Sequence, residues 1–377
     1  MDLAYCYRSH VTSHALKKTP LFDRHVALGA KTADFGGWDM PIEYSGVVAE
    51  HTAVRTAVGV FDVSHMGKVA VYGDGAVDFL NSVLANDLNR IPAGKAQYSM
   101  LCNESGGVID DLIVYRWSDD DVFIIPNASN AATVIAALRA VAPSTITIDD
   151  QHLTHGIIAV QGPKSDDVMR ALDFPFEHDY MSMEMARFNA APVVVCRTGY
   201  TGEHGFELVA PNEVLVDLWN AAVAAAEGVG GLPAGLGARD TLRTEMGYPL
   251  HGQDISPTIS PVTAGLGWAI GWDKPEFAGR EALLAEKAAG PARRLRGILA
   301  NDRGIPRAHM NVHADSLDGA VIGEVVSGTF SPTLKQGVGL ALLDSSTQIG
   351  DTVVVDVRGR ASEFTVAKPP FVQPSTR

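Results

Sequence analysis

The sequence predicts an α+β fold in which a small β-rich domain follows a larger mixed region. Up to about Gly279, short apolar segments are interspersed with Ala-rich helical segments, without the regular strand-helix alternation of a doubly wound parallel sheet. Beyond that point, short β-type segments separated by Gly, Asp and Pro predict a barrel or sandwich. With 377 residues, 46% of them hydrophobic, the chain can bury a large core and form two or three domains.

Helices are expected where apolar residues recur at helical spacing. The second of them follows the turn Gly73-Asp74-Gly75, and the two longest are rich in alanine. The expected helices cover residues 47–57, 76–84, 131–142, 213–228 and 239–246.

Strands are expected at 68–72, 113–115 and 122–125, where apolar and β-branched residues alternate or run together. Residues 118–121 predict a hairpin turn between the last two strands. Their three aspartates indicate a solvated loop rather than a metal site, because adjacent carboxylates in a turn point away from one another. The C-terminal strands are expected at 294–299, 321–327, 339–343, 352–357 and 363–367, with a hairpin signal at Asp318-Gly319.

Charge and composition limit the class of partner. A net charge of -14 and a pI near 5.2 argue against general binding to nucleic acid or to a membrane surface. No run approaches about 18 uninterrupted apolar residues, so we expect a soluble protein. Cys6, Cys102 and Cys196 form no CxxC pair, which favours a reducing compartment: the cytoplasm, or the mitochondrial matrix if the source is a eukaryote. Residues 1–18 are basic, and we expect an N-terminal extension rather than a transit segment.

A Gly-Gly turn leads into a strand that carries two adjacent carboxylates, Asp110 and Asp111. Because side chains alternate faces along a strand, one carboxylate points inward and the other outward. An inward carboxylate is costly to bury unless it meets hydrogen-bond donors or a charged ligand, which makes it a candidate reactive group. The alternative is a turn aspartate that caps the Gly106-Gly107 loop beside a solvated neighbour.

A second candidate site is the glycine-rich stretch 197–207. Its glycines allow close approach of a ligand, Tyr200 can stack on a ring, and Glu207 can accept hydrogen bonds from ring N–H groups. A glycine-rich β-hairpin without a ligand is the alternative.

Arg239 ends another glycine-rich stretch, 228–240, which lacks the Lys-Ser/Thr pair of a phosphate-binding loop. We therefore do not expect nucleotide binding. Arg239 is expected either to anchor a carboxylate or carbonyl group, or to form a salt bridge with Asp240 or Glu245.

Neither metal-dependent nor nucleophilic catalysis is indicated. His152 and His155 lack a third ligand, and His65 and His251 are isolated from other candidate ligands, so no metal is expected. The sequence contains no GxSxG elbow, and no cysteine has a motif-level catalytic partner.

In their order along the chain these motifs resemble the aminomethyltransferase of the glycine cleavage system, the T-protein family. The resemblance runs from Thr19 to about Val372, and nine moderately specific blocks in one order make it highly specific. The blocks are TPLF at 19–22, DFGGWDMP at 34–41, GVFDVSHMG at 59–67, residues 94–114, QGP at 161–163, residues 197–207, AGLGARD at 234–240, LHGQD at 250–254 and SGTFSPT at 327–333.

The resemblance implies a three-domain cloverleaf around a central folate channel, with a β-barrel as the C-terminal domain. The implied divisions are 1–66 together with 151–279, an inserted domain at 67–150, and 280–377. It also implies that tetrahydrofolate is a co-substrate and that the lipoylated H-protein is the partner. The family takes an aminomethyl group from the lipoyl arm, releases ammonia, and leaves 5,10-methylenetetrahydrofolate and dihydrolipoyl protein.

The resemblance further implies the site residues. Asp111, the second carboxylate of the pair, matches the catalytic position. The positions that match the folate pocket are Tyr98, Asn127, Tyr200, Glu207 and Arg239, with Met66 and Val114 as apolar walls. This set suits a flat pterin ring, which needs aromatic or apolar faces and a carboxylate at its edge. A carboxylate that orients the attacking nitrogen and stabilises positive charge contributes on the order of 10²–10⁴-fold in rate.

Thr263 stands where family members often have Glu, which leaves that one contact in doubt. Two alternatives to the aminomethyltransferase remain. One is a related folate-dependent demethylase acting on a small amine or sulfonium, and the other is a folate-binding module without catalysis. Retention of Asp111 argues against the second.

Overall fold

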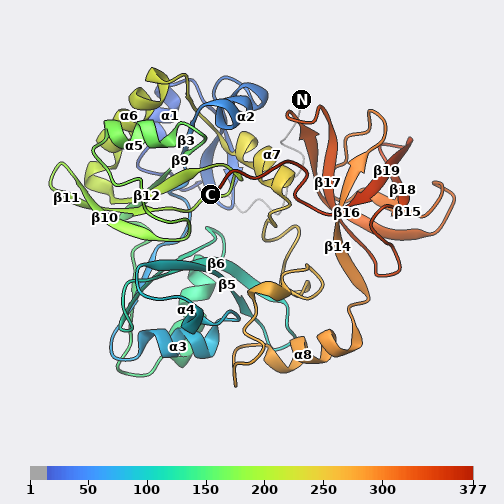
Figure 1. Cartoon of the computed structure of the whole chain (residues 1–377), viewed down its shortest axis with the longest axis horizontal. Helices are drawn as coiled ribbons and strands as arrows, with labels where there is room; N and C mark the ends of the chain where they lie inside the picture. Colours follow the sequence, from blue (N-terminus) through green and yellow to red (C-terminus); the bar gives the residue numbers. More distant parts are fainter. Residues whose placement is uncertain (1–14, 377) are drawn as a thin grey trace.

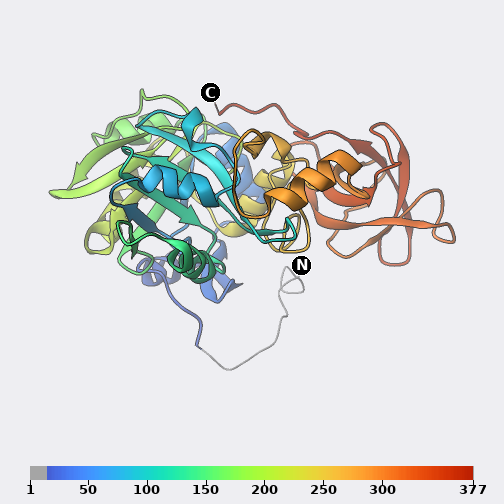
Figure 2. The same ribbon diagram turned by 90° about the horizontal axis from the view of Figure 1, so that it is seen from below.

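The computed structural model describes residues 15–376. Cys6 and most of the expected N-terminal extension lie outside this range. Three β-structured lobes form the molecule: a six-stranded sheet, a five-stranded sheet and a closed six-stranded barrel (Figure 1). This arrangement confirms the expected α+β cloverleaf with a C-terminal barrel. Seen from below, the barrel occupies one end of an elongated molecule and the two sheets the other (Figure 2).

The first lobe is a mixed sheet in the order β10-β11-β12-β9-β3-β13. Its central strands β3 and β9 are far apart in sequence but pair antiparallel, with Phe61 opposite Ala159. Helix α6 packs against the sheet and buries Trp219. The strands are β3 (Gly59–Asp62), β9 (His155–Gln161), β10 (Met183–Phe188), β11 (Ala191–Cys196), β12 (Gly205–Pro211) and β13 (Leu232–Pro233), and the helices are α1 (Phe22–Ala27), α2 (Val47–Thr56), α5 (Ser165–Ala171), α6 (Asn212–Gly228) and α7 (Leu236–Met246).

The second lobe is inserted between β3 and β9, with strand order β5-β6-β7-β4-β8. The predicted hairpin between β6 and β7 is confirmed: the N–H of Trp117 donates to the carbonyl of Asp121 at 3.0 Å. Two amphipathic helices cover one face of this sheet and contribute to its apolar core. The elements are β4 (Val69–Tyr72), β5 (Lys95–Cys102), β6 (Val108–Arg116), β7 (Asp121–Pro126), β8 (Thr147–Asp150), α3 (Ala76–Val83) and α4 (Ala131–Val141).

The first two lobes share an apolar interface. Phe61 and Ala159 of the first lobe belong to the same buried cluster as Tyr115 and Phe123 of the second. The hydroxyl of Tyr115 also hydrogen-bonds that of Thr198 at 2.9 Å. Burial of large apolar side chains across this interface fixes the two lobes relative to each other.

The third lobe is a barrel in the order β14-β17-β16-β15-β18-β19, closed by pairing of β14 with β19. Closure leaves no free strand edge. Five of its strands were predicted. The three-residue β15 is too short to show an alternating pattern, and the preceding helix α8 was also missed. The elements are α8 (Arg280–Ala289), β14 (Arg293–Ala300), β15 (Asn311–His313), β16 (Val321–Ser331), β17 (Gln336–Asp344), β18 (Thr352–Asp356) and β19 (Ala361–Ala367).

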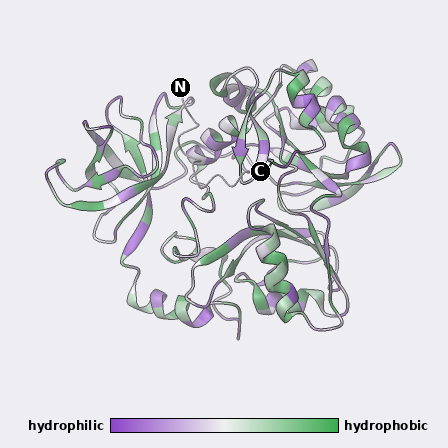
Figure 3. Cartoon of the chain, turned by 180° about the vertical axis from the view of Figure 1, so that it is seen from behind, coloured by the Kyte–Doolittle hydropathy of each residue, from purple (hydrophilic) through white to green (hydrophobic). Residues whose placement is uncertain are grey.

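A separate two-stranded hairpin, β1 (Lys31–Phe35) and β2 (Trp38–Glu43), lies against α7, and its turn reaches a surface cavity. Hydrophobic segments run through the strands of all three lobes, as expected if each lobe has its own core (Figure 3).

Candidate active site

The carboxylate pair on β6 is divided between the two faces of its sheet. Asp110 is the inward member: it is fully buried on the face that α4 covers. Its carboxylate accepts the backbone N–H of Asn127 at 2.9 Å and the side-chain amides of Asn127 at 2.9 Å and Asn130 at 2.7 Å. Burial and the charge of Asp111 raise the pKa of Asp110. With three N–H donors around it, Asp110 organises the segment that leads into α4.

Asp111 is the outward member and is only partly buried. One carboxylate oxygen accepts the Tyr98 hydroxyl at 3.0 Å, and the other accepts the side-chain amide of Asn127 at 2.8 Å. Burial raises the pKa of Asp111, and the hydrogen bonds from Tyr98 and Asn127 oppose that rise. Asp111 is therefore an accessible carboxylate whose direction is fixed by hydrogen bonds from Tyr98 and Asn127.

Hydrogen bonds through Asn130 connect this pair to His251. The Nε2 of His251 donates to the carbonyl of Val108 at 2.9 Å, so its Nδ1 accepts the Asn130 amide at 2.9 Å. The same Asn130 amide nitrogen reaches Asp110. The fold brings the loop of His251 onto the start of β6 and so into contact with the Asn130 amide, a contact that the sequence did not indicate.

Tyr98 stacks on Trp268, with ring centroids 5.7 Å apart and an interplanar angle of 27°. Trp268 is 65% exposed although it is a large apolar side chain. An exposed tryptophan beside the Tyr98–Asp111 hydrogen bond offers a flat face to an incoming ring. Sequence reasoning missed this residue, since nothing in its local pattern distinguishes it from a core tryptophan.

Tyr200 and Arg239 form a second group. The guanidinium carbon of Arg239 lies 4.8 Å from the centroid of the Tyr200 ring, and the Tyr200 hydroxyl donates to the carbonyl of Pro249. Burial lowers the pKa of Arg239, and its Nη1 is buried with no hydrogen-bond partner among residues 15–376. A buried guanidinium N–H without a partner is costly, so this donor is suited to an acceptor on a ligand.

The salt bridges considered for Arg239 do not form. Asp240 pairs with Arg243 at 2.8 Å, and Glu245 pairs with Arg55 at 2.7 Å. Both acidic neighbours are therefore occupied, and the Nη1 of Arg239 is left without a hydrogen-bond partner in the described part of the chain.

Glu207 lies on β12, where its carboxylate accepts the Thr198 hydroxyl at 2.6 Å. The negative charge of Glu207 opposes the lowering of the Arg239 pKa by burial. The two groups of residues also act on each other: burial raises the pKa of Tyr200, and the charge of Asp111 adds to that rise. The loop at 249–251 links the two groups, because the carbonyl of Pro249 accepts the Tyr200 hydroxyl and His251 accepts the Asn130 amide.

A cavity of about 500 Å³ opens beside this region. Met66 and Asn127 lie in its wall, as does the half-buried His251. Its lining residues come from the end of β1 and the turn after it, the loop after β3, the segment before α4 and the loop after α7: Asp34, Phe35, Gly36, Gly37, His65, Met66, Asn127, Ala128, Ser129, Leu250, His251, Gly252 and Gln253.

Val114 is not part of this wall. It lies on the same face of β6 as Asp110, is fully buried, and packs in the core beneath α3 and α4. Ile113 shares the face of Asp111 instead and packs at the interface with the first lobe. The period of two along a strand separates Val114 from Asp111.

No helix in the described part of the chain is long and apolar enough to cross a membrane. Residues 15–376 also contain no group of three or more His, Cys, Asp or Glu side chains arranged to hold a metal ion.

Two family models match the chain: the GCVT N-terminal domain over residues 21–274, and the glycine cleavage T-protein C-terminal barrel domain over residues 293–373. The protein named aminomethyltransferase of Parafrankia sp. (strain EAN1pec) is 59% identical over 364 residues, covering 96% of this chain and 99% of that protein. The protein of the same name from Mycobacterium tuberculosis (strain ATCC 25618 / H37Rv) is 56% identical over 360 residues, covering 95% and 97%.

A crystal structure of the glycine cleavage system aminomethyltransferase T from Bartonella henselae superimposes with a TM-score of 0.90. It shares 33% sequence identity and covers 96% of this chain and 99% of its own. The matched regions include both sheets, the barrel and every residue of the site described above. The chain therefore belongs to the glycine cleavage T-protein family of aminomethyltransferases.

Proposed function

We propose that this chain carries out the aminomethyltransferase step of glycine cleavage. The methylene carbon of an aminomethyl group on the lipoyl arm of the H-protein passes to tetrahydrofolate, and ammonia leaves. The products are 5,10-methylenetetrahydrofolate and dihydrolipoyl H-protein. The observation that carries this proposal is the partly exposed Asp111, held by Tyr98 and Asn127, together with the buried Nη1 of Arg239, which has no hydrogen-bond partner within residues 15–376.

The residues present suit a folate. Its pterin ring is flat and rich in N–H donors and acceptors, so its edge needs a carboxylate and its faces need aromatic rings. Glu207 supplies a carboxylate, while Tyr98, Tyr200 and Trp268 supply aromatic faces. The buried N–H of Arg239 supplies a donor for a carbonyl or carboxylate of the ligand.

Asp111 is assigned the catalytic role. Its carboxylate orients the folate nitrogen that attacks the one-carbon unit and stabilises the positive charge that develops there. Tyr98 and Asn127 fix the direction of the carboxylate, so that little reorganisation is needed during the reaction. Asp110 and Asn130 hold Asn127 and its neighbours in place from the buried side.

The lipoyl arm requires an opening from the surface to this region. We assign this role to the 500 Å³ cavity, because its wall includes Asn127, a direct partner of Asp111. The H-protein would then dock transiently around the β1–β2 turn and the loop at 250–253.

The test is tetrahydrofolate-dependent release of ammonia from aminomethylated H-protein by the purified chain. We expect turnover only when both substrates are present. Folate binding without turnover would support a non-catalytic module, and turnover with a small methylated amine in place of the H-protein would support a demethylase.

A further inference from the structure

The last residues of the chain leave the barrel and return to the first lobe. After β19 the C-terminal segment passes the end of α7 and reaches the strands of the first lobe (Figure 1). We call residues 371–376 the C-terminal strap, and residues 197–204, between β11 and β12, the pocket loop. The pocket loop carries Tyr200, so the strap ends beside the proposed folate site.

The strap is held first at the end of α7. The N–H of Phe371 donates to the carbonyl of Glu245 at 2.8 Å. A Cβ placed on Gly247 would lie 2.2 Å from the Cβ of Pro369, and one on Gly297 would lie 2.8 Å from the Phe371 ring. Glycine at both positions lets the chain pass closely over α7 and β14.

Three contacts then join the strap to the pocket loop. The N–H of Ser375 donates to the carbonyl of Gly202 at 2.8 Å, and the Ser375 hydroxyl donates to the carboxylate of Glu203. Arg197 donates to the carbonyl of Thr376 at 3.0 Å. Both ends of the pocket loop are therefore bound to the strap, with Tyr200 between them.

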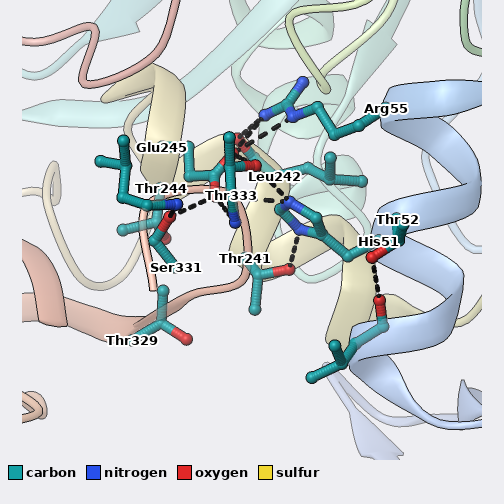
Figure 4. Close-up of polar contacts among 12 residues, drawn as sticks. His51, Thr52, Arg55, Thr241, Leu242, Thr244, Glu245, Thr329, Ser331 and Thr333 are labelled. Carbon is teal, nitrogen blue, oxygen red and sulfur yellow. Dashed lines mark hydrogen bonds and ion pairs between the residues drawn. The ribbon is translucent and has the colours of Figure 1, made fainter. Parts of the chain in front are cut away.

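The other side of the pocket loop is tied by Arg55 to a buried network around Glu245, and Figure 4 shows the contacts of that network. Arg55 of α2 donates to Glu203 at 2.8 Å and to the carbonyl of Thr201 at 2.7 Å, and it also donates to Glu245 at 2.7 Å. The figure shows Ser331 and Thr333 of the barrel side approaching the same Glu245 carboxylate. Glu203 thus bridges this rigid network and the strap.

We propose that the C-terminal strap positions the pocket loop, and through it Tyr200, for folate binding. The loop is rich in glycine and lacks regular secondary structure, so its own backbone does not define one conformation. The Tyr200 ring must stay against Arg239 to keep the pocket shape. The inference rests on the proposed function for the identity of the ligand, but not for the contacts between strap and loop.

The test compares two single-residue variants of the full chain. Ser375→Pro removes both the backbone N–H that reaches Gly202 and the hydroxyl that reaches Glu203. Gln373→Ala is the matched control, because Gln373 lies in the same strap and its side chain is exposed. Neither residue belongs to the proposed catalytic or binding set.

For Ser375→Pro we expect the Kd for tetrahydrofolate, measured by calorimetry, to rise about tenfold, since two hydrogen bonds of ordinary strength are lost. The kcat at saturating folate should stay within about twofold of wild type, because Asp111 and its partners are untouched. Gln373→Ala should change the Kd by less than about twofold. An unchanged Kd in Ser375→Pro would overturn the proposal, and so would a fall in kcat with no change in KM.

Hydrogen exchange of the folate-free protein separates this inference from the proposed function. Amides of the pocket loop should exchange about tenfold faster in Ser375→Pro than in wild type, whereas amides of α7 should not change. This result would support the strap even if the wild-type chain turned over no aminomethyl group. Wild-type exchange rates in the pocket loop of a correctly folded variant would refute it.

Discussion

Replacing Asp111 by Asn is the most direct test of the active site. The side chain keeps its shape and one carbonyl oxygen, which can still accept the Asn127 amide, now 2.8 Å from the Asp111 carboxylate. The new amide group can donate to the Tyr98 hydroxyl, which at present donates to Asp111 at 3.0 Å. The substitution therefore removes the charge and leaves the geometry close to that of the wild type.

The expected loss follows from the role of the charge. A preorganised group that stabilises developing charge is worth about 3–4 kcal/mol in known active sites, or about 10²- to 10³-fold in kcat. Folate affinity should change by less than about threefold, because the aromatic faces, Glu207 and Arg239 are unaffected. The melting temperature should not fall, since burial already raises the pKa of Asp111 and the charge does not favour folding.

The assay is steady-state transfer from aminomethylated H-protein at saturating tetrahydrofolate, which gives kcat, with folate Kd measured separately by calorimetry. Asp110→Asn is the control on the opposite face of the same strand. It places an amide against the N–H donors of Asn127 and Asn130, so we expect it to lower the free energy of unfolding by about 2–3 kcal/mol with a milder effect on kcat. A variant Asp111→Asn that keeps more than a tenth of wild-type kcat, or equal kinetic losses in both variants, would refute the assignment.

Three further results are expected. Arg239→Met should raise the Kd for folate at least tenfold in calorimetry. The melting temperature should not fall, because the Nη1 that is lost has no partner within residues 15–376. A loss of stability with unchanged folate affinity would contradict the anchor role. Tyr200→Ala and Glu207→Ala should each weaken folate binding several-fold while the residual kcat persists, and unchanged affinity in both would place the pocket elsewhere. Burial alone would raise the pKa of Glu245, but hydrogen bonds and charge from its partners lower it to about 2 from 4.5. The ionised Glu245 therefore contributes about 3 kcal/mol to the free energy of unfolding above pH 4.5, and this contribution is lost as the pH falls towards 2. In urea titrations, the stability difference between wild type and Glu245→Gln should shrink between pH 6 and pH 3. A difference that does not depend on pH would contradict this.

The elements predicted best were those with strong local signals. The Ala-rich helices α4 and α6 differ from their predicted bounds by one residue at one end, because their apolar spacing and flanking breakers are local properties. The hairpin between β6 and β7 follows from the polar turn at 118–121. The strand β15 was missed because three residues show no period. The helix α8 was missed although it is no less amphipathic than α4, because it follows directly on the change to β-type segments after about Gly279.

The sequence by itself determined that Asp110 and Asp111 occupy opposite faces, because alternation is a property of the strand backbone. Only the tertiary structure decided which face is covered. Helix α4 packs over the face of Asp110, and the segment before it supplies the amide donors of Asn127 and Asn130, while Asp111 faces Tyr98. The same alternation put Val114 in the core beneath α3 and α4.

Contacts between segments far apart in the sequence could not be predicted either, because they too depend on how the lobes pack. His251 meets Asn130 across 121 positions, and Ser375 meets Glu203 across 172, through hydrogen bonds that no local pattern encodes. Such contacts form only after burial of apolar side chains has fixed how the lobes pack. Local periodicity and motif order thus determined the elements and the family, whereas the packing of the lobes decided which polar groups meet, which are buried, and which remain free for a ligand.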